Sequence, residues 1–269
     1  MPPLRHSHTQ RELTLNADNL LKRDDLLKRD DLLKRDDLLK RDDLLKRYVA
    51  VWNEPDAAAR GAEVASLWTP DGLHHTQTRR FQGTEQLAAR IAEAHNQFVA
   101  GQGLRFRSGD NPVGHAGALS FNWLMTPGDS DTVLALGFDV VLLDNEGRII
   151  ADYQFNEPPL PTDELDAQAD RYLAAGTAEE PRKEVADLYL PGALYVDETG
   201  AHDGVDAIAA ALVTSGARQR AGSASAQHDA FRYPWRTATG ETGVDFLLRD
   251  DQGLVREHRR FVGAGRHSA

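Results

Sequence analysis

Residues 137–155 read GFDVVLLDNEGRIIADYQF, and residues 243–261 read GVDFLLRDDQGLVREHRRF. The two stretches align without a gap, and the residues that they share include, in the first stretch, Gly137, Asp139, Asp144, Gly147 and Phe155. Each has an Asp-x-x-Gly signal after an apolar run, which is typical of a β-hairpin turn whose glycine takes a positive φ. The pattern predicts the same pair of strands twice in one chain.

A second match lies upstream in the same order. Residues 62–91 read AEVASLWTPDGLHHTQTRRFQGTEQLAARI, and residues 183–212 read KEVADLYLPGALYVDETGAHDGVDAIAAAL, again aligned without a gap. Two matches in the same order predict a tandem duplication of one small domain. The stretch NEPPLPTDELD, residues 156–166, is rich in proline and acidic residues, which is typical of a linker.

The periodicity of apolar residues predicts the elements of the first copy. It indicates helices at 57–68 and 85–99, the second capped by Thr84, and a turn at 70–72. Strands are predicted at 73–81, 104–108, 117–125, 132–143 and 148–155. Helices followed by an antiparallel meander predict an α+β domain, in which the helices pack on one face of a curved antiparallel sheet.

The N-terminal region contains a six-residue repeat. From Leu20 to Arg47 the chain reads LLKRDD four times and then LLKR. Acid-to-base pairs four residues apart stabilise a helix, and neither Gly nor Pro interrupts the run. We predict a long helix that continues through Trp52 and ends near Pro55, because proline disfavours helix at the residue before it.

The leucines of the repeat fall on three faces of that helix about 120° apart, whereas a two-stranded coiled coil needs a single seam. Three interpretations stay open. The helix could be solvated and held by its ion pairs, or it could pack against several neighbours in a homo-oligomer. It could also be a natural or engineered repeat expansion with no selected role.

Composition argues against several classes of function. The 269-residue chain has no cysteine, which excludes disulfides and a cysteine nucleophile. Its formal net charge of −11 argues against a nucleic-acid partner, which favours a basic face. The N-terminus lacks the apolar core of a secretory signal, and no apolar run is long enough to span a bilayer. We expect a cytoplasmic protein without a membrane partner.

Four segments carry a family resemblance: RYVAVWNEPD at 47–56, LWTPDGLHH at 67–75, FQGTEQLAARI at 81–91 and LLDNEGRIIADYQF at 142–155. Their order resembles the nuclear transport factor 2-like superfamily and, within it, the SnoaL-like (polyketide cyclase-like) branch. The resemblance covers nearly all of 47–156 and, more weakly, 165–262. It implies a cone-shaped domain with a pocket between the helices and the concave sheet. It also implies dimers formed sheet to sheet, which two copies in one chain could form internally.

The expected organisation is two tandem cone-shaped α+β domains behind a long N-terminal α-helix. Its segments are a flexible N-terminus (1–17), the repeat helix, continuous with the first helix of domain 1 (18–47), domain 1 (48–156), a linker (157–164), domain 2 (165–263) and a flexible tail (264–269).

His74 is the first candidate for chemistry. It lies on the first predicted strand, where the resemblance places a pocket-facing polar residue, with Thr76 on the same face. Imidazole can act as a general base near pH 7, although a surface or simply hydrogen-bonded histidine would give the same pattern. Neighbouring residues of a strand point to opposite faces, so His75 diverges from His74 and no metal site is expected here.

Two aspartates follow in the last strands. Asp139 lies mid-strand in an apolar run, where a buried carboxyl must pair or keep a proton. It could abstract a proton beside a carbonyl, but an aspartate at the same place in the second copy favours an architectural role. Asp152 and Gln154 share one face of the last strand. Their counterparts, His258 and Arg260, differ in character, as a specialised pocket would require; an exposed sheet face is the alternative.

Aromatic residues complete the candidate sites. Tyr48, Trp52 and Trp123 could line an apolar ligand pocket or form plain core. In the second copy the candidates for a pocket that polarises and deprotonates a ketone are Tyr195, Asp197 and Tyr233. No phosphate loop, dinucleotide motif or nucleophile elbow is present, so no cofactor is expected.

The sequence therefore predicts a protein that binds a small apolar organic molecule in domain 1. The resemblance allows a cofactor-independent isomerase, cyclase or hydrolase that uses acid–base chemistry, or a binder without activity. The alternative is a non-catalytic assembly protein, whose N-terminal helix or sheet faces form a homo-oligomer. Whether the chain is an enzyme is left open by the sequence.

Overall fold

The computed structural model describes residues 40–265, of which residues 44–265 belong to one compact unit. The predictions for the flexible N-terminus, most of the repeat helix and the last residues of the tail lie outside the described residues. Residues 40–53 are helical, so the predicted helix end ahead of Pro55 is confirmed. The last two leucines of the repeat, Leu44 and Leu45, are buried in an apolar core.

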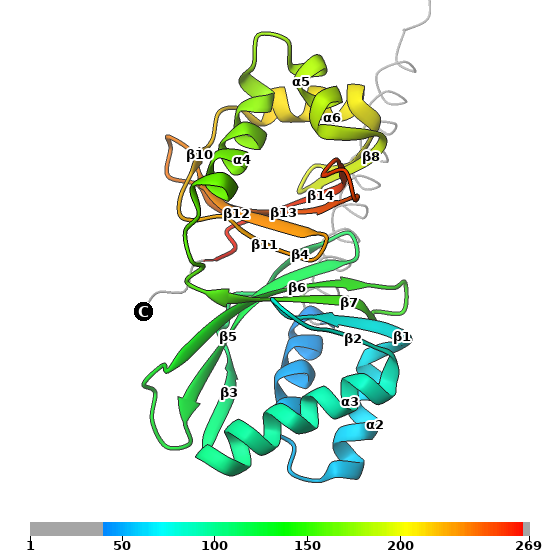
Figure 1. The fold of residues 1–269 in the computed structure, drawn as a ribbon, viewed down its shortest axis with the longest axis vertical. Helices are drawn as coiled ribbons and strands as arrows, with labels where there is room; N and C mark the ends of the chain where they lie inside the picture. The colour runs from blue at the N-terminus through cyan, green and yellow to red at the C-terminus, as the bar shows by residue number, and fades with distance from the viewer. Residues whose placement is uncertain (1–39, 266–269) are drawn as a thin grey trace, which may run out of the picture. The chain divides into compact units, whose positions relative to one another are not determined.

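The N-terminal half, residues 44–157, is a sheet of seven strands with helices on one face (Figure 1). The strand order is β2-β1-β7-β6-β5-β3, with β4 paired to β5, and only the β1–β7 pair is parallel. The elements are α2 (Ala57–Leu67), β1 (Trp68–His75), β2 (Arg80–Gln82), α3 (Gly83–Ala94), the π-helix η1 (His95–Ala100), β3 (Leu104–Ser108), β4 (Val113–His115), β5 (Ala118–Pro127), β6 (Ala135–Leu143) and β7 (Ile149–Glu157).

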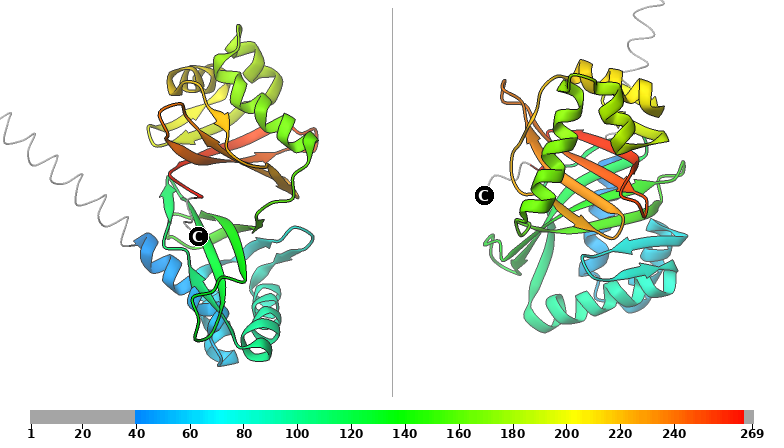
Figure 2. Two further views of the ribbon diagram at one scale, coloured as in Figure 1. Left: turned by 90° about the vertical axis from the view of Figure 1, so that its left-hand side faces the viewer. Right: turned by 45° about the horizontal axis from the view of Figure 1, so that its top comes forward.

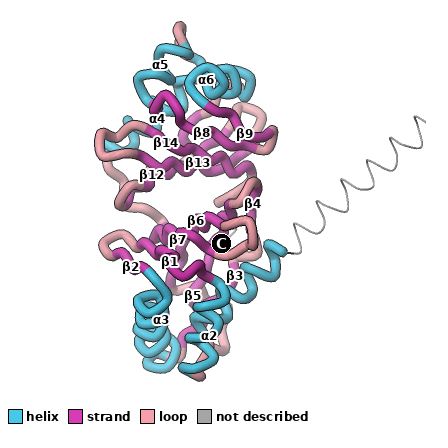
Figure 3. The backbone as a smooth tube through the Cα atoms, turned by 90° about the vertical axis from the view of Figure 1, so that its right-hand side faces the viewer, coloured by secondary structure: helices cyan, strands magenta, loops and turns pink. Residues whose placement is uncertain are grey.

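The C-terminal half, residues 163–265, has the same arrangement, with strand order β9-β8-β14-β13-β12-β10 and β11 paired to β12. Its helices gather on one side of its sheet (Figures 2 and 3). The elements are α4 (Asp163–Ala174), η2 (Ala175–Thr177), α5 (Pro181–Leu188), β8 (Tyr189–Asp197), β9 (Gly200–Asp203), α6 (Gly204–Ser215), β10 (Gln219–Arg220), β11 (Ser225–Gln227), β12 (Ala230–Arg236), β13 (Thr242–Arg249) and β14 (Val255–Val262).

Three apolar clusters hold the chain together. One lies between helices and sheet in each half, and the third joins the two sheets. In the third cluster the rings of Tyr153 and Phe155 lie 5.2 Å and 6.4 Å from the ring of Phe246. This confirms that Tyr153 and Phe155 share one face of β7 and leaves the opposite face to Asp152. No helix of residues 40–265 is long and apolar enough to cross a membrane.

Several local predictions were wrong. Residues 70–72 do not separate helix from strand, because β1 already begins at Trp68 and carries them as an irregularity in its pairing with β7. The single strand predicted at 73–81 is two antiparallel strands, β1 and β2. Helix α3 begins at Gly83 without a side-chain cap, so Thr84 does not cap it. The short strand β4 was not predicted.

One contact recurs in the middle of both sheets. In the N-terminal half Trp123 on β5 lies opposite Gly137 on β6, and its indole nitrogen donates to Asp139 Oδ1 at 3.0 Å. In the C-terminal half Trp235 lies opposite Gly243 and donates to Asp245 Oδ1 at 2.8 Å. The indole must cross the glycine to reach the aspartate two residues on, so any side chain at the glycine would collide with the ring.

Replacing Gly137 with alanine tests this packing. The added Cβ would overlap the Trp123 indole, and overpacking of this kind costs about 1–3 kcal/mol of unfolding free energy, here at the upper end. Chemical denaturation would measure the loss. Gly61→Ala is the matched control, because a Cβ meets nothing there and alanine favours helix α2 by up to about 1 kcal/mol. Equal stability of the Gly137→Ala variant and the unaltered chain would contradict the packing argument.

Candidate functional site

A buried hydroxyl joins two buried carboxyls in the N-terminal half. Tyr48, on the helix of residues 40–53, places its hydroxyl oxygen 2.7 Å from Asp139 Oδ2 and 2.7 Å from Asp152 Oδ2. Asp139 on β6 and Asp152 on β7 are both fully buried. The two strands are neighbours, and Asp139 lies opposite Gln154 in their register. This geometry puts Asp152 and Gln154 on the face of β7 that points into the domain, so an exposed sheet face is not what the structure has.

Proton counting restricts the charge of this cluster. A tyrosine hydroxyl has one proton to donate, and an ionised carboxylate can only accept. Two hydrogen bonds to carboxyl oxygens therefore require one of the two carboxyls to be protonated. Burial, and next the charge of Asp152, raise the pKa of Asp139 well above its ordinary value. Asp139 is accordingly the neutral partner, which donates to Tyr48 while Tyr48 donates to Asp152.

Burial and the two carboxyls also raise the pKa of the Tyr48 phenol well above its ordinary value. The phenol therefore stays protonated and remains a donor. Two buried carboxyls at this spacing would repel if both were ionised, so a shared proton is the stable arrangement.

His74 extends the chain of hydrogen bonds. It lies beside Asp152 in the parallel pairing of β1 and β7, and its Nδ1 is 2.7 Å from Asp152 Oδ2. Because the carboxylate accepts, Nδ1 carries the proton, which leaves Nε2 as the free ring nitrogen. That Nε2 is buried and has no hydrogen-bond partner among the described residues, and the same holds for Asp152 Oδ1.

Three side chains enclose the His74 ring. The ring centres of Trp52 and Phe81 lie 5.7 Å and 6.0 Å from it. The Arg90 guanidinium lies over both aromatic rings, at 5.4 Å and 5.9 Å. Trp52 was predicted for this wall, but Phe81 and Arg90 were not. On α3, Arg90 directly precedes the buried Ile91. This position beside the inward face of the helix is the feature of the sequence that could have indicated Arg90 as part of the wall.

Other predicted residues are placed as follows. Trp123 and Gln154 both belong to the surroundings of Asp139, since each hydrogen bonds to its carboxyl. Thr76 does not join His74, because its hydroxyl pairs with the backbone of Arg79 in the β1–β2 turn. His75 diverges from His74 as predicted and stacks on Tyr153 with ring centres 4.6 Å apart.

In the C-terminal half the aspartate equivalent to Asp139 has different hydrogen-bond partners. Asp245, at the place of Asp139, accepts two hydrogen bonds from Arg260 at 2.8 Å and 2.7 Å. His258 Nε2 lies 3.1 Å from Asp245, and its Nδ1 lies 2.8 Å from the hydroxyl of Tyr189. Burial alone would raise the pKa of Asp245, but Arg260 and then His258 outweigh burial and lower the pKa well below its ordinary value. This aspartate is ionised and paired.

Of the residues predicted for a second pocket, Tyr195 and Asp197 interact with each other, whereas Tyr233 lies beside Asp245. Tyr195 lies in the place of His74, with its ring 4.8 Å from that of His258. Tyr233 stacks on Tyr172 in the core, and burial followed by the charge of Asp245 raises its pKa well above the ordinary value. Asp197 stabilises the β8–β9 turn by accepting from the backbone nitrogen and the hydroxyl of Thr199 at 2.8 Å and 2.6 Å.

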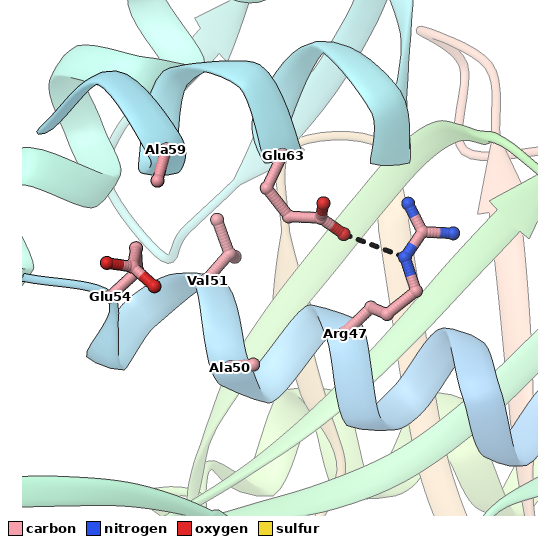
Figure 4. Close-up of a pocket in the computed structure, with 6 residues that line it drawn as sticks. All are labelled: Arg47, Ala50, Val51, Glu54, Ala59 and Glu63. Atoms are coloured by element: carbon pink, nitrogen blue, oxygen red, sulfur yellow. Dashed lines mark hydrogen bonds and ion pairs between the residues drawn. The ribbon is translucent and has the colours of Figure 1, made fainter. Parts of the chain in front are cut away.

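The described cavities lie away from His74. A groove of about 320 Å³ runs between the helix of residues 40–53 and α2, where Arg47 pairs with Glu63 at 2.7 Å (Figure 4). Ala50, Val51 and Ala59 supply its apolar part. A much smaller cavity of about 10 Å³ lies in the C-terminal half. Among residues 40–265 no three His, Asp or Glu side chains form a group that could hold a metal ion.

Comparisons with known proteins give matches to solved structures. No protein-family model and no curated protein matches the chain. A SnoaL-like family protein of Agrobacterium tumefaciens strain C58 is 30% identical, covering 44% of this chain and 98% of that chain with a TM-score of 0.41.

A nuclear transport factor 2-like protein of unknown function from Exiguobacterium sp. 255-15 is 14% identical, covering 43% of this chain and 99% of its own, with a TM-score of 0.35. A SnoaL-like protein of unknown function from Burkholderia thailandensis E264 is 13% identical, covering 44% and 95%, with a TM-score of 0.35. These structural neighbours are SnoaL-like and nuclear transport factor 2-like proteins.

The two equivalent aspartates should respond oppositely to substitution by asparagine. Asp139 keeps its proton in the fold, so its stabilising contribution is full below the unfolded pKa of about 3.9 and is lost as pH rises through the folded pKa. Asparagine stays neutral and escapes this loss. Relative to the unaltered chain, Asp139→Asn should therefore gain about 1 kcal/mol or more between pH 4.5 and pH 7.5.

Asp245→Asn is the matched control, because it leaves the Arg260 guanidinium buried without a carboxylate. We expect a loss of about 3–5 kcal/mol at pH 7. Since the pKa of Asp245 is lowered, its contribution is present above the unfolded pKa and is lost only as pH falls through the folded pKa. Urea denaturation at several pH values measures both. A loss at Asp139 that equals the loss at Asp245 at pH 7 would show that Asp139 is ionised.

Proposed function

We propose that the chain consists of two tandem SnoaL-like domains, residues 48–156 and 165–263, and that the first binds a small, largely apolar organic molecule and performs acid–base chemistry on it without a cofactor. The observation that carries the proposal is the buried His74–Asp152 pair, whose Nε2 and Oδ1 have no partner among the described residues. A neighbour of known structure carries the provisional description of an isomerase of the SnoaL-like family.

The proposed base is His74. Its Nε2 takes a proton from the carbon next to a substrate carbonyl, and the electrons of the broken C–H bond move to the carbonyl oxygen to form an enolate. Asp152 accepts from Nδ1 and stabilises the imidazolium that results. Return of the proton to another carbon gives an isomer. Alternatively, attack by the enolate carbon on a second carbonyl closes a ring, and the imidazolium returns its proton to the alkoxide oxygen that this attack forms.

Tyr48 and Asp139 have positioning roles in this scheme. The Tyr48 hydroxyl fixes Asp152, and the neutral Asp139 holds that hydroxyl in place. A neutral Asp139 also leaves Asp152 as the single negative charge beside the imidazole. This division of labour supports an architectural role for Asp139 rather than a direct one as base.

Substrate entry needs a movement of the wall. His74 is 1% exposed, so Trp52, Phe81 and Arg90 close the site in this conformation. Phe81 on β2 and Arg90 on α3 are only half-buried, and the Arg90 guanidinium lies 5.9 Å from the Phe81 ring. We therefore place the entrance between these two side chains, with Trp52 as the apolar inner wall.

Homo-oligomer formation through the N-terminal repeat stays a separate proposal. Most of the repeat lies outside the described residues. Leu44 and Leu45, the leucines of the repeat that lie among the described residues, pack into the core of the same chain. Their burial accounts for two of the leucines without a second copy, so we favour the acid–base proposal.

Solvent deuterium exchange into the α-carbon of 2-tetralone, followed by NMR, tests the proposed base. We expect the unaltered chain to accelerate exchange, and His74→Gln and Asp152→Asn to lower the rate by about 100-fold or more. His75→Gln is the matched control, because burial and next His228 lower the pKa of His75 to about 4 and its ring faces the other side of the sheet. Unchanged exchange in His74→Gln would exclude His74 as the base.

A further inference from the structure

The small cavity of the C-terminal half has two guanidinium groups in its wall. It lies beneath α6 and is lined by Gly176, Ser215, Gly216, Arg218 and Arg260. Neither the sequence patterns nor the proposed chemistry of His74 accounts for it. Its volume of about 10 Å³ is close to the minimum that holds one water molecule, so it has room for a single oxygen atom of a ligand.

Comparison of the two halves explains why space is left here. The ion pairs Arg47–Glu63 and Arg171–Glu184 occupy the same relation in both halves. Five residues after the arginine, the first half has Trp52 and the second has Gly176. The large indole that covers His74 in one half is thus missing in the other.

A second difference between the halves lies after the helix that follows the first two strands, which is α3 in one half and α6 in the other. Extending the ungapped match of residues 62–91 by four places sets His95 opposite Gly216. His95 Nδ1 lies 3.2 Å from the backbone carbonyl oxygen of Trp52, so the two residues are neighbours, and both side chains are buried. In the C-terminal half both are glycine, and arginines line the space instead.

Arg260 and Arg218 differ in how their charges are balanced. Arg260 is fully paired with Asp245 through two hydrogen bonds. Arg218 Nη1 donates only to neutral oxygens, namely Ser215 O at 2.7 Å, Ser215 Oγ at 2.9 Å and Gly216 O at 3.1 Å. No ion pair joins Arg218 to a carboxylate among residues 40–265. Its Nε is buried and has no hydrogen-bond partner in the same part of the chain.

The two guanidiniums are held close together. Ser215 Oγ accepts from Nη1 of Arg218 and from Nη1 of Arg260 at 3.0 Å, so these nitrogens lie within about 6 Å of each other. Both groups also lie over the indole of Trp235, at 4.6 Å and 5.5 Å. Burial, and next the charge of Arg260, lower the pKa of Arg218, so the arrangement costs free energy as it stands.

We propose that this cavity is a binding site for one small oxyanion, a carboxylate group or an anion of the same planar shape, held between Arg218 and Arg260. Two guanidinium groups that are fixed side by side, with a carboxylate paired to only one of them, attract a second anion. The cavity admits one oxygen of the anion, and the remainder lies at the opening beside Gly216. A ligand with a large body would have to keep that body outside.

The test follows the indole Nε1–H signal of Trp235 in ¹H–¹⁵N spectra of the full chain. Sodium acetate is titrated against sodium chloride at equal ionic strength, and sodium nitrate forms a third series. We expect saturable shifts with acetate in the millimolar range and none with chloride. The indole signals of Trp52, Trp68 and Trp123 serve as internal controls. Binding of nitrate equal to acetate would identify a general planar-oxyanion site, whereas acetate alone would identify a carboxylate site.

Arg218→Gln should weaken acetate binding at least about tenfold, because the unpaired charge is removed. Arg220→Gln is the matched control, since that arginine is paired with Asp166 and Asp170 outside the cavity. If Arg218→Gln fails to fold, Arg218→Lys decides, because it keeps the charge but loses the planar fork and should bind more weakly. Equal shifts with acetate and chloride, or undiminished binding in both Arg218 variants, would overturn the proposal.

Discussion

The structure depends on one buried aspartate in the middle of each sheet. In both halves a tryptophan on the neighbouring strand reaches across a glycine and hydrogen bonds to that carboxyl. The contact fixes the glycine, the indole and the strand register together. It also places a group that prefers water inside an apolar core, where an unpaired charge would cost several kcal/mol. The surroundings of the aspartate must therefore supply either a proton or a positive charge.

The two halves use the two different solutions. Beside Asp139 the neighbouring strand carries Gln154 and Asp152, so the carboxyl keeps a proton and shares a tyrosine hydroxyl with a second carboxyl. That second carboxyl is then available to orient His74. Beside Asp245 the same strand positions carry Arg260 and His258, so the charge of the carboxylate is paired. The first arrangement suits proton transfer, and the second suits stability and attraction of an outside anion.

Much of this could be predicted from the sequence, and the rest fails for physical reasons. The repeated Gly-x-Asp and the alternation along 148–155 predict strands and faces, because period two is a local property. The end of the first helix follows from Pro55, because the effect of proline on the residue before it is also local. Phe81 was missed because the β1–β2 pairing that sets it opposite His74 was not predicted. Arg90 was missed because it reaches the site only through tertiary packing of α3 on the sheet. The Arg218–Arg260 pair was missed because two distant elements bring it together.

The charge of Asp139 at neutral pH is the central claim, and ¹³C NMR measures it directly. Aspartate labelled at the carboxyl carbon would be introduced into the full chain, and the signals of Asp139 and Asp245 assigned from their Asn variants. The account predicts a neutral-carboxyl chemical shift for Asp139 at pH 7 and an ionised one for Asp245. An Asp139 signal that is already ionised at pH 7 and titrates near its ordinary pKa of about 4 would contradict the account.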